Sequence, residues 1–139
     1  MKKNYSLIEH TADVGIKVRG RTKNELFKNS ALAVFDIIAE KKPAKNKIRR
    51  NITVKLKADS LESLLIEWLN ELISLSGARG LIFERFKILS LEDNQLKAII
   101  SGVPDKDYRV NVEIKAATYH QLKIKKTVGG WLAEVIFDV

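Results

Sequence analysis

The sequence contains no cysteine, only two prolines and a single methionine among its 139 residues. Without cysteine, the chain cannot form a disulfide, a thiolate metal site or a cysteine nucleophile. This absence is typical of a protein that works in a reducing compartment. A chain of this length can still bury enough apolar surface to fold without cross-links. We therefore expect a single domain over residues 1–139.

Long apolar runs are also missing. No segment approaches the roughly 20 consecutive apolar residues that a membrane-spanning helix needs. The first ten residues include Lys2 and Lys3 but lack the apolar stretch of a secretion signal. These absences predict a soluble, cytoplasmic protein with no membrane partner.

Acidic residues are scarce relative to basic ones: 17 Asp and Glu stand against 25 Lys and Arg, a net charge of +8. Excess positive charge favours acidic partners such as RNA or an acidic protein surface. The alternative interpretation is that the lysines only keep the protein in solution. Segment 41–50 concentrates six of the cations and contains no acid. It could contact phosphates, or it could be a solvated loop.

Hydrophobic periodicity predicts two amphipathic helices, at about residues 22–40 and 60–76. Thr22 and Glu25 have the spacing of a capping box at the start of the first helix. Asp59 is the expected cap of the second helix. Two glycines are expected to end the second helix: Gly77 and Gly80.

Alternating apolar and polar residues predict strands in the rest of the chain. The expected strands are 5–9, 13–19, 51–57, 81–91, 95–103, 108–125 and 131–139. Segment 108–125 keeps Val110, Val112 and Ile114 on one face, with a bend expected near 118–121 because strands usually run ~5–6 residues. Segment 135–137 is apolar on both faces, so the last strand should be central. The fold class is α+β: a largely antiparallel or mixed sheet covered by two helices.

Carboxylates stand near both ends of the sequence. Asp13 opens an expected strand, and Asp138 precedes Val139, whose terminal carboxylate would add a third anion. Hard cations such as Ca²⁺, Mg²⁺ and Mn²⁺ prefer oxygen ligands. If the strands that carry Asp13 and Asp138 are neighbours, a cation between them would offset their repulsion. Ordinary solvated carboxylates are the alternative interpretation.

Three further residues are candidates for chemistry. His10 and His120 could act as ligands or as acid–base groups, or they could be structural hydrogen-bonding residues. Two histidines at this spacing match no zinc pattern. Lys115 is either an outward sheet lysine or a cation close to the acidic residues. No phosphate-binding glycine loop and no serine nucleophile motif is present, so an enzyme is not expected.

Segments from both ends and the middle of the chain, taken together and in order, resemble the archease family. They are His10-Thr11-Ala12-Asp13-Val14-Gly15, Glu25-Leu26-Phe27, Ala31-Leu32-Ala33-Val34-Phe35, Glu113-Ile114-Lys115-Ala116-Ala117-Thr118-Tyr119-His120 and Val135-Ile136-Phe137-Asp138-Val139. The resemblance covers essentially the whole chain. The sequence departs from the family pattern at Ala117, where valine or isoleucine is frequent, and at Gln121, where glycine is frequent.

The resemblance implies a non-catalytic protein cofactor of the GTP-dependent tRNA-splicing RNA ligase. Such a cofactor promotes guanylylation of the ligase histidine and multiple turnover, and it acts on tRNA only indirectly. The resemblance also implies a divalent metal site at Asp13, Asp138 and Val139, for Ca²⁺ or alternatively Mg²⁺ or Mn²⁺, and a functional lysine at Lys115. The alternative function is an RNA-binding or tRNA-modification accessory protein that uses the basic segment 41–50.

Overall fold

The computed structural model describes residues 4–9, 13–41 and 48–139, which form two α-helices, a short 3₁₀ helix (η1, Asp105–Asp107) and three antiparallel sheets. The four-stranded sheet has the order β1 (Tyr5–Glu9), β2 (Asp13–Gly20), β9 (Gly130–Asp138) and β8 (Ala116–Thr127). The three-stranded sheet has the order β4 (Arg50–Lys57), β6 (Gln95–Pro104) and β5 (Leu81–Leu91). A short ribbon pairs β3 (Ala39–Lys41) with β7 (Tyr108–Val110).

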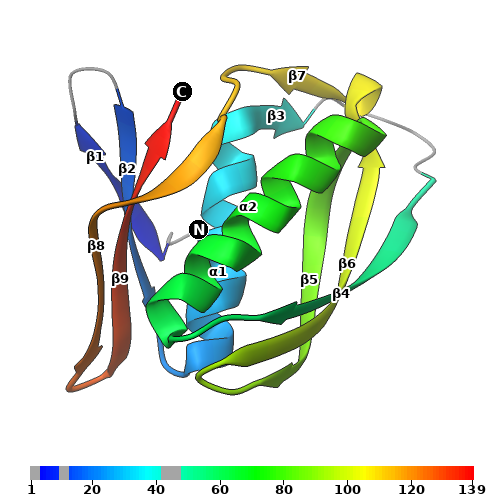
Figure 1. Ribbon diagram of the computed structural model, residues 1–139. Helices are drawn as coiled ribbons and strands as arrows, with labels where there is room; N and C mark the ends of the chain where they lie inside the picture. The colour runs from blue at the N-terminus through cyan, green and yellow to red at the C-terminus, as the bar shows by residue number, and fades with distance from the viewer. Residues whose placement is uncertain (1–3, 10–12, 42–47) are drawn as a thin grey trace.

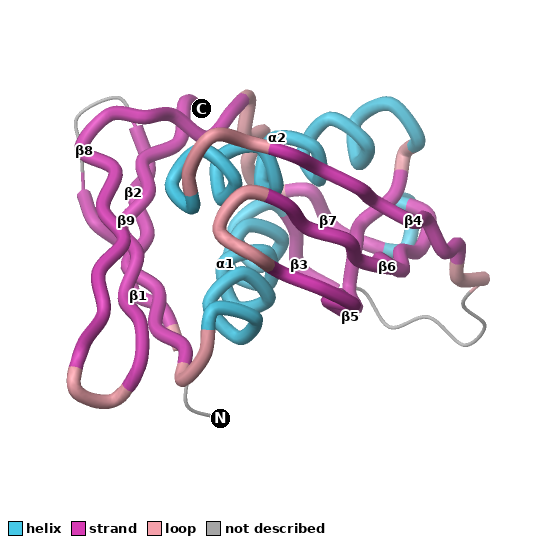
Figure 2. The backbone as a smooth tube through the Cα atoms, turned by 60° about the horizontal axis from the view of Figure 1, so that its bottom comes forward, coloured by secondary structure: helices cyan, strands magenta, loops and turns pink. Residues whose placement is uncertain are grey.

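The helices α1 (Lys23–Ile38) and α2 (Leu61–Arg79) lie between the four-stranded and the three-stranded sheet (Figures 1 and 2). This arrangement confirms the predicted α+β class with two helices and antiparallel strands. The expected single sheet is instead divided, because each of the two larger sheets covers a different side of the helix pair. Strand β9 lies between β2 and β8, so the prediction of a central last strand is also confirmed.

Polar caps set the start of each helix. The backbone N–H of Glu25 donates to Thr22 Oγ1 at 3.1 Å, as the capping pattern predicted. The expected cap at Asp59 is wrong by one residue. Ser60 has the extended backbone of a cap, and its Oγ accepts the Ser63 N–H at 3.1 Å.

The end of α2 is set by one of the two expected glycines. Gly77 lies within the helix, and Gly80 ends it with a φ of 63°. A residue without a side chain adopts this left-handed conformation at little cost.

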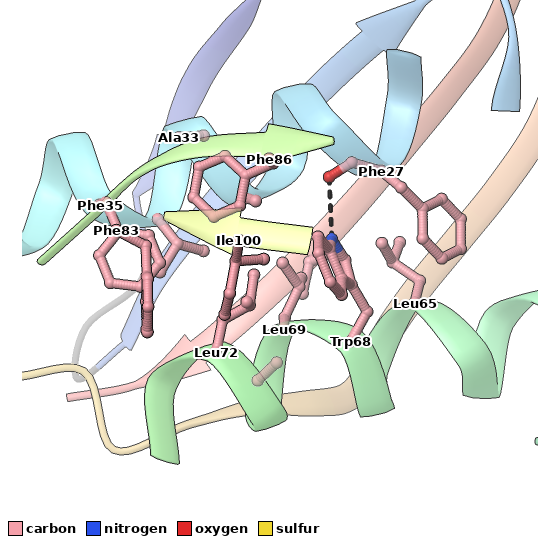
Figure 3. Packing of buried hydrophobic residues seen from close by; sticks show 14 of the residues in the cluster. Phe27, Ala33, Phe35, Leu65, Trp68, Leu69, Leu72, Phe83, Phe86 and Ile100 are labelled. Carbon is pink, nitrogen blue, oxygen red and sulfur yellow. Dashed lines mark hydrogen bonds between the residues drawn. The ribbon is translucent and has the colours of Figure 1, made fainter. Parts of the chain in front are cut away.

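The core joins both helices to both of the larger sheets. Figure 3 shows its part between the helices and the three-stranded sheet. Trp68 of α2 is fully buried, and its indole Nε1–H donates to the Phe27 carbonyl of α1 at 3.0 Å. Its ring meets Phe86 of β5 edge-on, with centroids 6.2 Å apart. Phe35 of α1 contacts the same sheet through Phe83, with centroids 5.7 Å apart. These contacts hold the two helices together and fix them on the three-stranded sheet.

The segment expected to be one long strand over 108–125 is interrupted. After β7 the chain is irregular through residues 111–115 and resumes as β8 at Ala116. Val110, expected to point inward, is 56% exposed because β7 leaves the larger sheets to pair with β3. The predicted bend is confirmed: the β8–β9 register shifts between Thr118 and Lys123, and Gln121 has a φ of 52°. This left-handed conformation is one that glycine adopts more readily than a residue with a side chain, so Gln121 holds it at some cost.

An ionic cluster holds the start of this segment. Glu84 of β5 accepts hydrogen bonds from the Tyr108 hydroxyl and from Arg49, the latter at 2.5 Å. Partial burial, followed by the hydrogen bond to Glu84, raises the pKa of the Tyr108 phenol above its ordinary value. Tyr108 therefore stays protonated and keeps β7 attached to the three-stranded sheet.

Candidate functional site

The register of the four-stranded sheet brings the two ends of the sequence together. Asp13 on β2 lies directly opposite Asp138 on β9, and Asp138 lies opposite Ala116 on β8. Directly opposed residues of antiparallel strands point to the same face of the sheet, with Cβ atoms about 4.5–5.5 Å apart. Two carboxylates in this relation repel each other. The predicted meeting of Asp13 and Asp138 is therefore confirmed at the level of strand register.

The two carboxylates lie on the outer face of the sheet. Ile16 and Val18 of β2 are fully buried on the face that packs on α1. Asp13 belongs to the alternate set of β2 residues, so it points to the other face. Asp138 is exposed and Asp13 is half-buried. The pair is thus accessible to a cation or to a partner.

Lys115 is fixed beside this pair by its backbone. Its N–H donates to the Asp138 carbonyl at 2.8 Å, while the preceding Ile114 is buried in the core. The Lys115 side chain is exposed. We call Asp13, Lys115 and Asp138 the carboxylate corner. The backbone of Lys115 adjoins the two opposed anions, and among the described residues no ion pair joins its exposed side chain to either of them.

Sequence reasoning missed Asn70, which holds the adjacent strand in place. The Asn70 side chain of α2 accepts the Ala117 N–H at 2.7 Å and donates to the Ala117 carbonyl at 3.2 Å. Asn70 and Lys115 also line an open groove of about 710 Å³ beside residues 110–116. The available signal was an asparagine at helical spacing from two apolar residues, Ile66 and Ile73.

We expect Asn70→Ala to lower the free energy of unfolding by about 1–3 kcal/mol, because both backbone polar groups of Ala117 lose their partner. It should also increase amide hydrogen exchange at residues 115–118. Urea unfolding and hydrogen exchange measure the two effects. Ser74→Ala, at an exposed position of the same helix, is the control and should change neither. Equal exchange in Asn70→Ala and wild type would show that the hydrogen bonds of Asn70 do not order residues 115–118.

Of the two histidines, only His120 lies in the part of the chain that the structure describes. His10 lies outside the described residues, as do Thr11 and Ala12 of the same motif. His120 is exposed on the bulge of β8, where its N–H donates to Thr118 Oγ1 at 3.3 Å. Over residues 4–9, 13–41 and 48–139, no group of three His, Cys, Asp or Glu side chains has the proximity of a metal site.

The basic segment 41–50 falls mostly outside the described residues, which resume at Ile48. Of its described cations, Arg49 is engaged with Glu84, and Arg50 is exposed at the start of β4. No described helix is long and apolar enough to span a membrane.

Comparison with known proteins agrees with this architecture. Two helices between antiparallel sheets, with an early strand paired to the last one, define a small α+β protein with a carboxylate pair at one end of a sheet. Residues 5–139 match the model of the Archease protein family (MTH1598/TM1083). The chain therefore belongs to the archease family.

Relatives and solved structures are similar over nearly the whole chain. Protein archease of Methanosarcina mazei is 36% identical over 143 residues, which cover 99% of this chain and 97% of the relative. Protein archease of Pyrococcus furiosus is 37% identical over 139 residues, covering 94% and 95%. The solution structure of Methanobacterium thermoautotrophicum protein 1598 superposes with a TM-score of 0.74 at 26% identity, covering 99% of this chain and all of that one. The Thermotoga maritima structure, described as an archease and possible chaperone, has a TM-score of 0.66 at 25% identity, covering 95% and 94%.

Proposed function

We propose that this archease is a cytoplasmic, non-catalytic activator of the GTP-dependent tRNA-splicing RNA ligase. It would promote guanylylation of the ligase histidine and so sustain multiple turnover. The observation that carries the proposal is the carboxylate corner, in which Asp13 opposes Asp138 and Lys115 is hydrogen-bonded beside them. These are the residues that the family resemblance assigns to metal binding and activation.

The corner has the donor chemistry for a hard divalent cation. Asp13 and Asp138 supply carboxylate oxygens, and Val139 follows directly with a further main-chain oxygen. Ca²⁺ takes roughly 6–8 oxygen ligands, so these groups would leave positions for water or for oxygens of a partner. Mg²⁺ and Mn²⁺ accept the same donors. When bound, the cation would neutralise the opposed carboxylates and add positive charge at an exposed edge.

Lys115 would supply the second positive charge at that edge. Its side chain is exposed, and its backbone bond to Asp138 holds the start of the side chain in place. Nucleotidyl transfer depends mainly on positioning and on neutralising phosphate charge. The adjacent groove beside residues 110–116 offers a surface against which the ligase can dock. Lys115 would then contact phosphate oxygens or a carboxylate of the ligase site.

The proposal is tested by measuring ligase guanylylation and RNA joining with and without this protein, at substrate excess. Wild-type protein should accelerate guanylylation and convert a single turnover into many. Lys115→Ala should lose this effect while unfolding at the same temperature as wild type. Lys125→Ala, which removes another exposed strand lysine, should retain it. An undiminished effect of Lys115→Ala would remove Lys115 from the mechanism, and no effect of wild type would reject the function.

A further inference from the structure

A second charged surface lies on the three-stranded sheet. Burial alternates along its strands: Val54, Phe86 and Ala98 are buried, so their immediate neighbours point outward. Five cations occupy these outward positions, and all of them are exposed: Lys55, Lys57, Arg85, Lys87 and Lys97. We call these five residues the basic face.

No outward position in the paired registers of these strands carries a carboxylate. Glu84 of β5 lies at a bulge and is bonded to Arg49 and Tyr108, while Asp59 and Glu92 lie beside the Lys57 end of the face. The other outward residues of these strands are neutral: Asn51, Thr53, Ser90, Gln95, Ile99 and Ser101 at paired positions, and Leu89 at a bulge. Within the described part of the chain, none of the five cations forms an ion pair. The outer face of the four-stranded sheet differs, because Glu134 there lies 3.8 Å from Lys123. The basic face is therefore a concentration of cations that form no ion pairs with other described residues, with Asp59 and Glu92 at its Lys57 end.

One pair of lysines within the basic face destabilises the folded protein when no anion is bound. Lys55 on β4 lies directly opposite Lys97 on β6. Like charges at directly opposed positions of antiparallel strands repel each other and destabilise the sheet. Outward residues recur every ~6.8 Å along a strand, and strands lie about 4.8 Å apart. A polyanion with closely spaced charges would contact several of these cations together and offset the repulsion.

The composition of the face indicates which polyanion. Protein interfaces are enriched in aromatic residues and depleted of lysine in their cores, whereas β4, β5 and β6 expose no aromatic ring. Proteins that bind single-stranded RNA without sequence preference stack bases on aromatic side chains. Double-helical RNA instead presents phosphates and 2′-hydroxyls on its outside and is recognised by shape. We propose that the basic face binds the phosphate backbone of double-helical RNA.

The location of the face makes this binding compatible with a partner at the carboxylate corner. The two larger sheets lie on opposite sides of the helices, with the C-terminal end of β9 in the four-stranded sheet (Figures 1 and 2). RNA on one side and a protein on the other would not compete for the same surface. RNA binding by this face does not depend on the proposed ligase activation, so each can fail separately.

Fluorescence anisotropy with a labelled RNA duplex tests the proposal without any ligase. The duplex should have about 20 base pairs, because a double-stranded RNA-binding domain spans ~16. Wild-type affinity should fall steeply as KCl rises. Lys55→Ala combined with Lys97→Ala should weaken binding about tenfold and reduce the salt slope by about two. Lys125→Ala combined with Lys126→Ala removes two exposed lysines elsewhere and should change affinity less than twofold.

Lys97→Glu separates binding from folding. It places a carboxylate opposite Lys55 and should leave the unfolding temperature unchanged or higher. It should weaken RNA binding more than Lys55→Ala combined with Lys97→Ala does. Three results would overturn the proposal: no salt-dependent duplex binding by wild type, equal losses in the two double variants, or tighter binding of single-stranded RNA or polyglutamate than of duplex.

Discussion

Asp13→Asn should abolish ligase activation and remove the stabilisation of this protein by divalent cations, while leaving its fold intact. The amide keeps the size of the side chain but removes one of the two opposed charges. A ligand that binds only the folded state at 100 times its Kd adds about 2.7 kcal/mol to the free energy of unfolding. Wild type should gain about this much with Ca²⁺, and Asp13→Asn should gain almost nothing.

Without a divalent cation, wild type should no longer be the more stable of the two proteins. Removing one of two directly opposed like charges should make Asp13→Asn as stable as wild type, or more stable by about 0.2–1 kcal/mol. Thermal unfolding with EDTA and with CaCl₂, MgCl₂ or MnCl₂ measures both effects and identifies the preferred cation. Asp59→Asn, at an exposed position before α2, is the control and should respond to cations like wild type. Equal stabilisation of Asp13→Asn and wild type would exclude Asp13 as a ligand.

Trp68→Ala should have the largest effect on stability, lowering the free energy of unfolding by about 3–5 kcal/mol. The ring is fully buried where α1, α2 and β5 meet, and its N–H is bonded to the Phe27 carbonyl. Alanine would leave a cavity at this junction and break the link between the helices. Urea unfolding followed by circular dichroism measures the loss.

Trp68→Phe separates the contribution of the buried apolar ring from that of the hydrogen bond to Phe27. Phenylalanine retains most of the buried apolar surface but cannot donate to Phe27, a bond worth about 0.5–1.5 kcal/mol net. We expect this variant to lose less than half of what Trp68→Ala loses. A loss in Trp68→Ala below about 1 kcal/mol, typical of surface positions, would contradict the central place of Trp68 in the core.

The features predicted correctly from sequence are those that leave a local pattern. The helices have apolar faces of 3.6-residue period and polar caps, so their extents were predictable to within three residues at either end. The apolar run Val135-Ile136-Phe137 indicated a central strand, and the structure places it between β2 and β8. A central last strand is what allows Asp138 to have both Asp13 and Ala116 as direct neighbours.

The features that were missed depend on contacts between distant segments. The break after Val110 arises because β7 pairs with β3, a pairing with no signal in the alternation of residues 108–125. The hydrogen bonds between Asn70 and Ala117 could be predicted only with the knowledge that α2 passes beside β8. The basic face depends on Lys55 and Lys97, 42 positions apart in sequence, lying opposite each other. None of these can be inferred from local periodicity.

A double-mutant cycle in the ligase turnover assay tests most directly whether the two ends of the sequence form one functional site. The four proteins are wild type, Asp13→Asn, Asp138→Asn and the double variant, each checked for an unfolding temperature in EDTA no lower than that of wild type. If both carboxylates hold one cation, each single substitution should remove the activation, and the double variant should be no worse than either. Independent effects that multiply in the double variant, or full activation by either single variant, would contradict a shared site at Asp13 and Asp138.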